Sequence, residues 1–97
     1  MPRVFLSRRA FEDVQRLADF LAENDERVAR ETLELIRSAV APLEQHPFLG
    51  RPAEHGLREL VISRGKTGYV GLYEVDERKD RVIVHAVRHQ REAGFSR

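Results

Sequence analysis

The 97-residue chain contains no cysteine and no tryptophan, and only 7% of its residues are aromatic. Without cysteine it can form no disulfide, no thiolate zinc site and no cysteine nucleophile. No apolar run approaches the roughly 18 residues that a membrane-spanning helix requires. The N-terminal segment also has no apolar stretch of signal-peptide length. These absences predict a cytoplasmic protein without a membrane partner.

The length allows one small domain, which we expect to span residues 1–97. Charged residues make up 34% of the chain, although the formal net charge is only +1. The charge is uneven, because residues 1–48 carry a net −2 and residues 49–97 a net +3. Fifteen of the seventeen cations are arginines, whose planar donor fork suits carboxylates and phosphates. We therefore expect the two halves to have separate structural and contact roles.

Two amphipathic helices are predicted after a short β-prone segment at residues 3–6. Ser7 is placed to cap the first helix, which should end near Asn24. Asn24 or Asp25 can cap the second helix, and this short connection predicts an antiparallel helix hairpin. Pro42 lies inside the second helical pattern and should kink or break it. The apolar stripes comprise Phe11, Val14, Leu17, Ala18 and Leu21 in the first helix, and Val28, Thr32, Leu33, Ile36, Val40 and Leu43 in the second.

Three β-prone runs follow a loop over residues 46–57 that is punctuated by glycine and proline. The runs cover residues 58–63, 69–75 and 81–89, and their short polar connections predict a hairpin between each neighbouring pair. The element order predicts an α+β fold. In it, an N-terminal strand is followed by an antiparallel helix hairpin packed on an antiparallel sheet with a C-terminal three-stranded meander.

Two motifs suggest a ligand site and are rejected on their spacing. The Gly-Lys-Thr sequence at residues 65–67 resembles the end of a phosphate-binding loop, but Leu60 stands where that motif needs its first glycine. It also leads into a strand rather than a helix, so we interpret it as a hairpin turn. His85 and His89 would lie about 13 Å apart on one strand, too far to share an ion. We therefore expect no metal site and no cofactor.

The end of the last strand carries a cluster of polar side chains that suits chemistry or contact. His89 lies between Arg88 and Arg91 in the sequence. A histidine at a strand end can act as a general acid or base near neutral pH, and the arginines can bind phosphate or carboxylate. The alternative is a solvated strand end with ion pairs. His85, between valine and alanine, is interpreted as a satisfied histidine of the core or sheet face.

Tyr69 and Tyr73 share one face of the middle strand with Gly71, whose missing side chain allows another element to approach closely. Either the tyrosines pack against the helices, or with Arg58 they form an exposed face that suits a protein or single-stranded RNA partner. The residue types leave both alternatives open.

Four segments resemble the ParE/RelE family of bacterial toxins from type II toxin–antitoxin modules, over nearly the whole chain. They are HPFLGRP, LRELVIS, GYVGLYEVD and VIVHAVRHQREAGF, and the final AVRHQREAGF is most similar to ParE-type members of plasmid-stabilisation systems. The resemblance implies a strand, helix hairpin and meander. It also implies a small DNA-binding antitoxin, whose C-terminal segment wraps the toxin in a hetero-oligomeric complex.

The family resemblance implies one of two toxic mechanisms. ParE-like members poison DNA gyrase without chemistry of their own, whereas RelE-like members cleave mRNA on the ribosome with basic and aromatic side chains. At the nuclease positions this chain has Val61, Ser63 and Val70, and Phe95 stands near the place of a terminal tyrosine. Only Arg91 matches a basic catalytic position. Gyrase inhibition with growth arrest is therefore the leading hypothesis.

Two alternatives to gyrase inhibition stay open. If the chain cleaves mRNA, His89 and Arg91 are the expected catalytic residues. If it is a degenerate, non-toxic module, it acts only as a co-repressor with its antitoxin on operator DNA. The expected target contacts are Arg58, Tyr69, Tyr73, Arg88, His89 and Arg91. The expected antitoxin contacts are Phe11, Val14, Leu17, Leu21, Val28 and Ile36.

Overall fold

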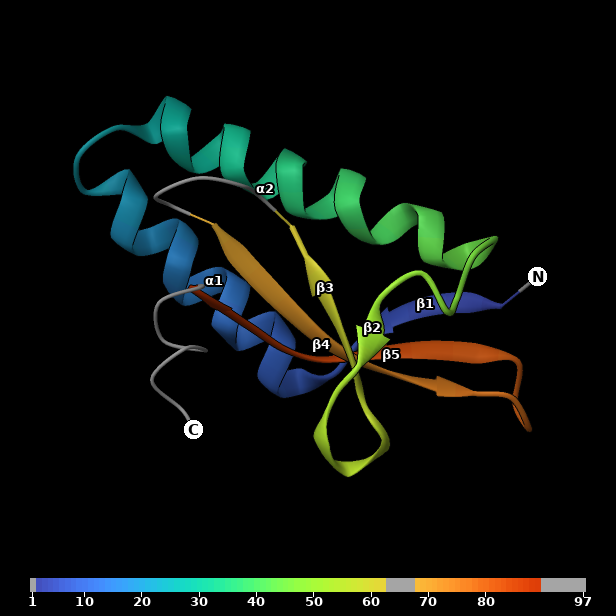
Figure 1. Cartoon of the computed structure of the whole chain (residues 1–97). Helices are drawn as coiled ribbons and strands as arrows, with labels where there is room; N and C mark the ends of the chain where they lie inside the picture. Colours follow the sequence, from blue (N-terminus) through green and yellow to red (C-terminus); the bar gives the residue numbers. More distant parts are fainter. Residues whose placement is uncertain (1, 63–67, 90–97) are drawn as a thin grey trace.

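The structure, a computed structural model, describes residues 2–62 and 68–89, and its elements follow the predicted order (Figure 1). The elements are β1 (Arg3–Leu6), α1 (Arg8–Ala22), α2 (Glu26–Val40), η1 (Ala41–Glu44), β2 (Arg51–Pro52), η2 (Glu54–Gly56), β3 (Arg58–Val61), β4 (Tyr69–Asp76) and β5 (Arg81–His89). Only the short elements β2 and η2 escape sequence analysis, because two or three residues are too few to show a periodic pattern.

Both helices begin at their predicted caps. The Ser7 hydroxyl accepts a hydrogen bond from the Ala10 amide at 3.1 Å, and the Asp25 carboxylate accepts one from the Arg27 amide at 2.9 Å. These side chains satisfy amides that the first helical turn leaves unpaired. At Pro42 the second helix gives way to the 3₁₀ turn η1, which confirms the predicted break. Among the described residues, no helix is both long and apolar enough to cross a membrane.

The sheet has five strands in the order β1-β5-β4-β3-β2. The pairs from β5 to β2 are antiparallel, as predicted for the meander. β1 instead pairs parallel to β5, with Arg3 opposite Arg81 and Leu6 opposite Val84, so the sheet is mixed rather than wholly antiparallel. The helix hairpin separates β1 from the other strands along the chain, so no tight turn fixes its direction.

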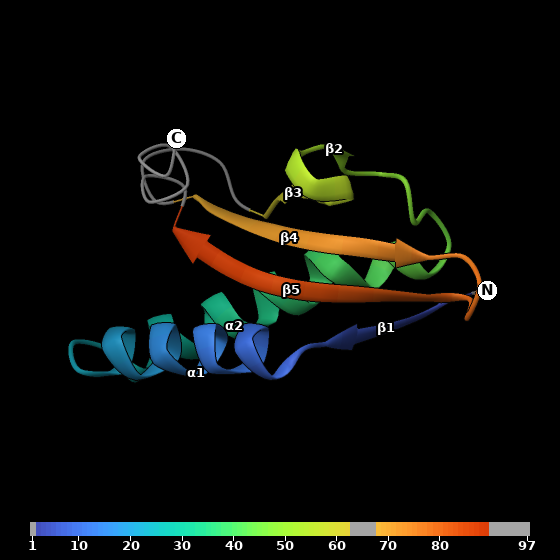
Figure 2. The same cartoon turned by 90° about the horizontal axis from the view of Figure 1, so that it is seen from below.

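Both helices lie on one face of the sheet (Figure 2). The hydrophobic core is built from side chains of α1, α2 and η1 together with those of the sheet. Within residues 2–62 and 68–89, neither α1 nor α2 covers the opposite face of β4 and β5, as is common for antiparallel strands. The buried core side chains are Ala10, Ile36, Val40, Leu43, Leu60, Ile62, Tyr69, Tyr73, Val82, Val84 and Val87.

The buried stripes of the helices are narrower than predicted. On α2, Ile36 is buried, but Val28 and Leu33 are 37% and 38% exposed. Ala29 takes the buried position beside Val28, since a step of one residue turns a side chain by about 100° around the helix axis. On α1, Phe11 is 60% exposed although the alanine before it is fully buried. Small side chains therefore form part of the buried surface of each helix, and larger apolar neighbours lie beside them at more exposed positions.

Candidate functional site

Tyr73 on β4 braces the loop that precedes β2. Its side chain is 1% exposed, and its hydroxyl donates to the Pro47 carbonyl at 2.8 Å and accepts from the Gly50 amide at 2.7 Å. Both hydrogen-bonding roles of the phenol are therefore used inside the chain. Its hydroxyl is thus engaged within the chain, and a contact of Tyr73 with a target stays a prediction.

Arg58 on β3 braces the same loop from its other side. Its guanidinium donates hydrogen bonds to the carbonyls of Phe48, at 3.2 Å, and of Gly50. The guanidinium carbon also lies 4.9 Å from the centre of the Phe48 ring, within the range of a cation–π contact. Arg58 thus points its Nη1 atom at the backbone of its own chain, and its role as a target contact stays a prediction.

Gly50 allows the loop to approach the sheet closely. A Cβ atom there would lie 2.6 Å from the Glu59 carbonyl oxygen and 2.8 Å from the Tyr73 side chain, which is too close for any carbon. At Gly71, where we expected such an approach, a Cβ atom would meet only Ile62, at an ordinary 3.5 Å. The close approach of two backbone segments therefore occurs in the loop and not on β4.

The braced loop leaves two large apolar side chains on the surface. Phe48 is 52% exposed and Leu49 is 57% exposed, and we call these two residues the loop tip. The Leu49 amide donates to the His46 carbonyl at 3.0 Å, so the backbone of the tip is held as well. Sequence analysis missed the loop tip, although the flanking Pro47 and Gly50 mark it as a turn.

A β-bulge interrupts the pairing of β5 with β4. Val84 lies opposite Tyr73 and Ala86 opposite Leu72, so His85 is an extra residue on β5. A bulge of this kind changes which side chains face the core on either side of it. The core side chains of β5 are accordingly two residues apart before the bulge and three residues apart across it.

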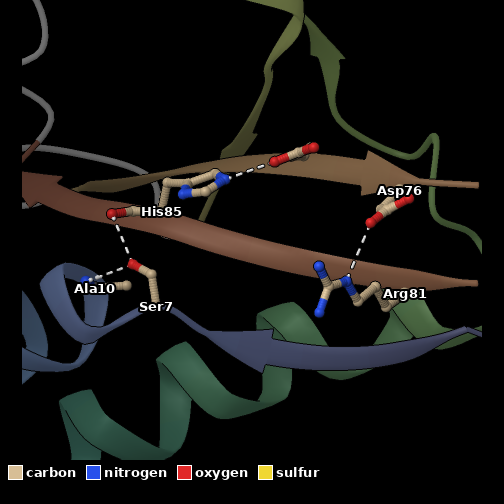
Figure 3. A network of polar contacts seen from close by, with 6 residues as sticks. Ser7, Ala10, Asp76, Arg81 and His85 are labelled. Atoms are coloured by element: carbon tan, nitrogen blue, oxygen red, sulfur yellow. Dashed lines mark hydrogen bonds and ion pairs between the residues drawn. The ribbon is translucent and has the colours of Figure 1, made fainter. Parts of the chain in front are cut away.

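Ser7, at the start of α1, forms hydrogen bonds with the backbone of β5 at the bulge. The Ser7 amide donates to the Val84 carbonyl at 2.9 Å, and the Ser7 hydroxyl donates to the His85 carbonyl at 3.2 Å (Figure 3). Further along α1, the Asp13 carboxylate accepts a hydrogen bond from the Val87 amide at 3.0 Å. The Asp13 side chain is only 9% exposed. These contacts satisfy backbone groups of β5 beyond the end of β1, a role for Asp13 that no sequence pattern indicates.

The two histidines of β5 have different partners. His85 Nε2 lies 2.8 Å from a carboxylate oxygen of Glu74, and both side chains are partly exposed, in accord with the interpretation of a satisfied sheet-face histidine. The His89 ring meets the Tyr69 ring edge-on, with 5.7 Å between centres. Tyr69 is only 7% exposed and belongs to the core, and its role as a target contact stays a prediction. Arg88 and His89 are partly exposed at the end of β5.

Some predicted positions lie outside the described residues. They are Ser63, the turn sequence at residues 65–67, Arg91 and Phe95. Within residues 2–62 and 68–89, no three histidine, aspartate or glutamate side chains gather in a way that could hold a metal ion.

An ion pair closes the hairpin between β4 and β5, at the far end from His89. The Arg81 Nε atom lies 3.1 Å from a carboxylate oxygen of Asp76 (Figure 3). Desolvation raises the pKa of Asp76. Hydrogen bonds from the Lys79 amide and the Arg81 side chain, together with the charges of these two residues, outweigh it and hold this pKa below its ordinary value. The carboxylate of Asp76 therefore stabilises the turn in its ionised form.

The helix hairpin keeps apolar surface that the sheet does not cover. Phe11 is 60% exposed and Val28 is 37% exposed, and the three other predicted antitoxin contacts on α1 are partly buried. Ile36 is 5% exposed and belongs to the core, and its role as an antitoxin contact stays a prediction. The remaining apolar surface is thus centred on the flanks of the two helices.

Comparison with known sequences places the chain in a class of bacterial toxins. A family model described as the ParE toxin of the type II toxin–antitoxin system parDE matches residues 4–94. Toxin RelE3 of Caulobacter vibrioides is 36% identical over 92 residues, which cover 95% of this chain and 98% of that protein. The chain belongs to the ParE family of toxins of type II toxin–antitoxin systems.

Solved structures share this fold. The chromosomal ParDE toxin–antitoxin system from P. aeruginosa contains a chain with a TM-score of 0.77 and 20% identity, covering 92% of this chain and 96% of that one. The toxin–antitoxin complex RelBE2 from Mycobacterium tuberculosis contains one with a TM-score of 0.59 and 22% identity, covering 92% and 91%. These similarities confirm the predicted ParE/RelE fold.

Proposed function

We propose that this toxin inhibits DNA gyrase and is neutralised by a cognate antitoxin. The observation that supports the gyrase proposal is that this chain has valines at positions where RelE-like nucleases place basic residues. Val61 is 44% exposed and Val70 is 5% exposed, and neither can move a proton or stabilise a phosphate charge. Arg58 and Tyr73 are engaged with the loop backbone. The described surface of the sheet therefore favours binding over nuclease catalysis.

Arg88 and His89 are the target contacts we propose at the end of β5, and Arg91 follows them in the sequence. The first two are partly exposed, and the bulge held by α1 sets the face on which each of them lies. Arginine suits this role because its fork of donors can bind carboxylates or phosphates at two points.

A supercoiling and DNA-cleavage assay with purified gyrase and antitoxin-free toxin tests the gyrase proposal. We expect inhibition with accumulation of cleaved DNA. Arg91→Ala should lose this inhibition while keeping the fold and antitoxin binding. Arg8→Ala is the matched control, because it removes the same charge from a 93% exposed side chain on α1. No inhibition at high molar excess of the wild type would contradict the proposal.

The antitoxin is proposed to cover the apolar flanks of the helix hairpin, around Phe11 and Val28. Exposed apolar surface of this kind commonly receives the apolar side chains of a partner segment. Phe11→Ser should weaken antitoxin binding measured by calorimetry without lowering the melting temperature by more than a few degrees. The neighbouring exposed change Glu12→Gln is the control. An unchanged antitoxin affinity in Phe11→Ser would count against this surface.

A second candidate function is mRNA cleavage on the ribosome. The observation in its favour is the partly exposed pair of His85 and Glu74, 2.8 Å apart, a geometry that suits proton transfer. If gyrase is unaffected and mRNA is cleaved, His89 and Arg91 are the first residues to substitute, followed by His85. Expression without any growth arrest would favour the co-repressor alternative instead.

A further inference from the structure

We propose that the loop tip, Phe48 and Leu49, inserts into an apolar pocket on the folded protein that this toxin inhibits. The proposal rests on the proposed function only in that the target is a protein. Both side chains are more than half exposed and adjacent in the chain. Large apolar side chains that enter a pocket on a partner provide much of the binding energy of protein interfaces.

The backbone of the loop tip is held in place before any partner binds. Tyr73 bonds to the carbonyl of Pro47 and the amide of Gly50, which flank the tip on each side. Arg58 bonds to the carbonyls of Phe48 and Gly50. Two buried or partly buried side chains of the sheet thus fix a surface segment that displays apolar groups. Such a segment loses little conformational entropy on binding, which favours affinity.

The charges around the loop tip favour a protein over a nucleic acid. Arg51 forms an ion pair with Glu59, and the guanidinium of Arg58 bonds to backbone carbonyls. Arg51 is therefore already paired with a carboxylate, and the Nη1 atom of Arg58 is already engaged by the loop backbone, whereas binding of nucleic acid depends on arginines that contact phosphates. Leu49 also has no flat ring on which a base could stack. An apolar pocket fits both side chains of the tip.

The loop tip lies apart from the surface proposed for the antitoxin. The loop leads into β2, at one edge of the sheet, whereas α1 packs against β5 (Figure 1). β3 and β4 separate β2 from β5 in the sheet. Binding of the target by the tip and binding of the antitoxin by the hairpin can therefore be tested separately.

The test is the double variant Phe48→Ser with Leu49→Ser in the full chain. Because both side chains are exposed, we expect it to keep the melting temperature within a few degrees and to bind the antitoxin with unchanged affinity. We expect it to lose growth arrest on expression and at least about tenfold of its potency against purified gyrase, as removal of an interface anchor does. Phe20→Ser on α1, where the side chain is 62% exposed, is the matched control. It should keep growth arrest and its potency against gyrase.

The outcomes separate this proposal from the proposed function. If wild-type toxin does not inhibit gyrase but arrests growth, and the double variant does not arrest growth, gyrase is excluded and the loop tip stands as a target contact. If the folded double variant arrests growth as well as the wild type, the loop-tip proposal is overturned. A loss of antitoxin affinity with unchanged toxicity overturns it too, because the tip then belongs to the antitoxin surface. A wild type that arrests no growth overturns both proposals.

Discussion

The loop around the tip and the end of β5 are built by the same kind of contact, with opposite results on the surface. In the loop, Tyr73 and Arg58 from the sheet hold backbone groups and leave apolar side chains exposed. At the end of β5, Ser7 and Asp13 from the helix layer hold backbone groups of a strand that carries charged and polar side chains. The comparison shows that a polar residue type does not by itself identify a contact residue. Whether such a residue is available to a partner depends on whether its polar atoms already form hydrogen bonds with the backbone of the same chain.

Removal of Tyr73 should have the largest effect on stability, and it tests the loop brace. Tyr73→Ala removes a ring that is 1% exposed and should lower the free energy of unfolding by about 3–5 kcal/mol. Tyr73→Phe keeps the ring but leaves the Pro47 carbonyl and the Gly50 amide without this partner, and should cost about 1–3 kcal/mol. Chemical denaturation measures both. Equal stability of Tyr73→Phe and wild type would show that the hydroxyl does not brace the loop.

Substitution of Asp13 tests the contacts that hold the end of β5, which is the second region of the comparison. Asp13→Ala leaves the Val87 amide without its acceptor and should lower the free energy of unfolding by about 1–3 kcal/mol, with faster hydrogen exchange at that amide. Asp13→Asn keeps an acceptor oxygen and should retain most of the exchange protection. Asp19→Ala, on the exposed side of the same helix, is the control and should change stability by no more than about 0.5 kcal/mol. Unchanged exchange at Val87 in Asp13→Ala would remove Asp13 from this role.

Substitution of Asp76, in the turn between β4 and β5, should have the smallest effect on stability. This effect should depend on pH. Because the pKa of Asp76 is lowered in the folded chain, its ionised carboxylate stabilises the fold above the pKa of the unfolded chain. That contribution is lost as the pH falls through the lowered pKa. Asp76→Asn should therefore melt below the wild type at pH 7, and the two melting temperatures should converge in acid. Addition of Arg81→Gln to Asp76→Asn should lower the melting temperature little further, since the ion pair is already broken.

The sequence predicts the fold well because the signals for its elements are local. Ser7, Asp25 and Pro42 mark the ends of the helices through caps and a missing amide, and each acts within a few residues. The three strands of the meander likewise follow from short polar connections. The parallel pairing of β1 with β5 cannot be predicted in this way, because it joins residues about 80 positions apart through no turn.

The candidate site is predicted less well than the fold, for a related reason. Sequence analysis singles out Tyr73 and Arg58 as target contacts, but it does not show that they bond to the backbone of Pro47 and Gly50, because the sequence does not specify the path of that loop. The bulge at His85 is also hidden, because a single extra residue leaves the β-prone composition of the strand unchanged. The exposure of Phe48 and Leu49 follows only from the path of the loop.

The place of β5 in the sheet has a consequence for the order in which the chain can fold. β5 is the last described strand to be synthesised, yet it lies between β1 and β4 and pairs with both. A nascent chain that has not reached residues 81–89 has no partner strand for β1, and α1 lacks the strand on which it packs. The most distant pairing in the sequence is thus required to complete the fold, which slows folding and delays it until residues 81–89 have been synthesised. Toxicity that needs the folded sheet would begin only after that step, which gives the cell a short interval to supply a binding partner.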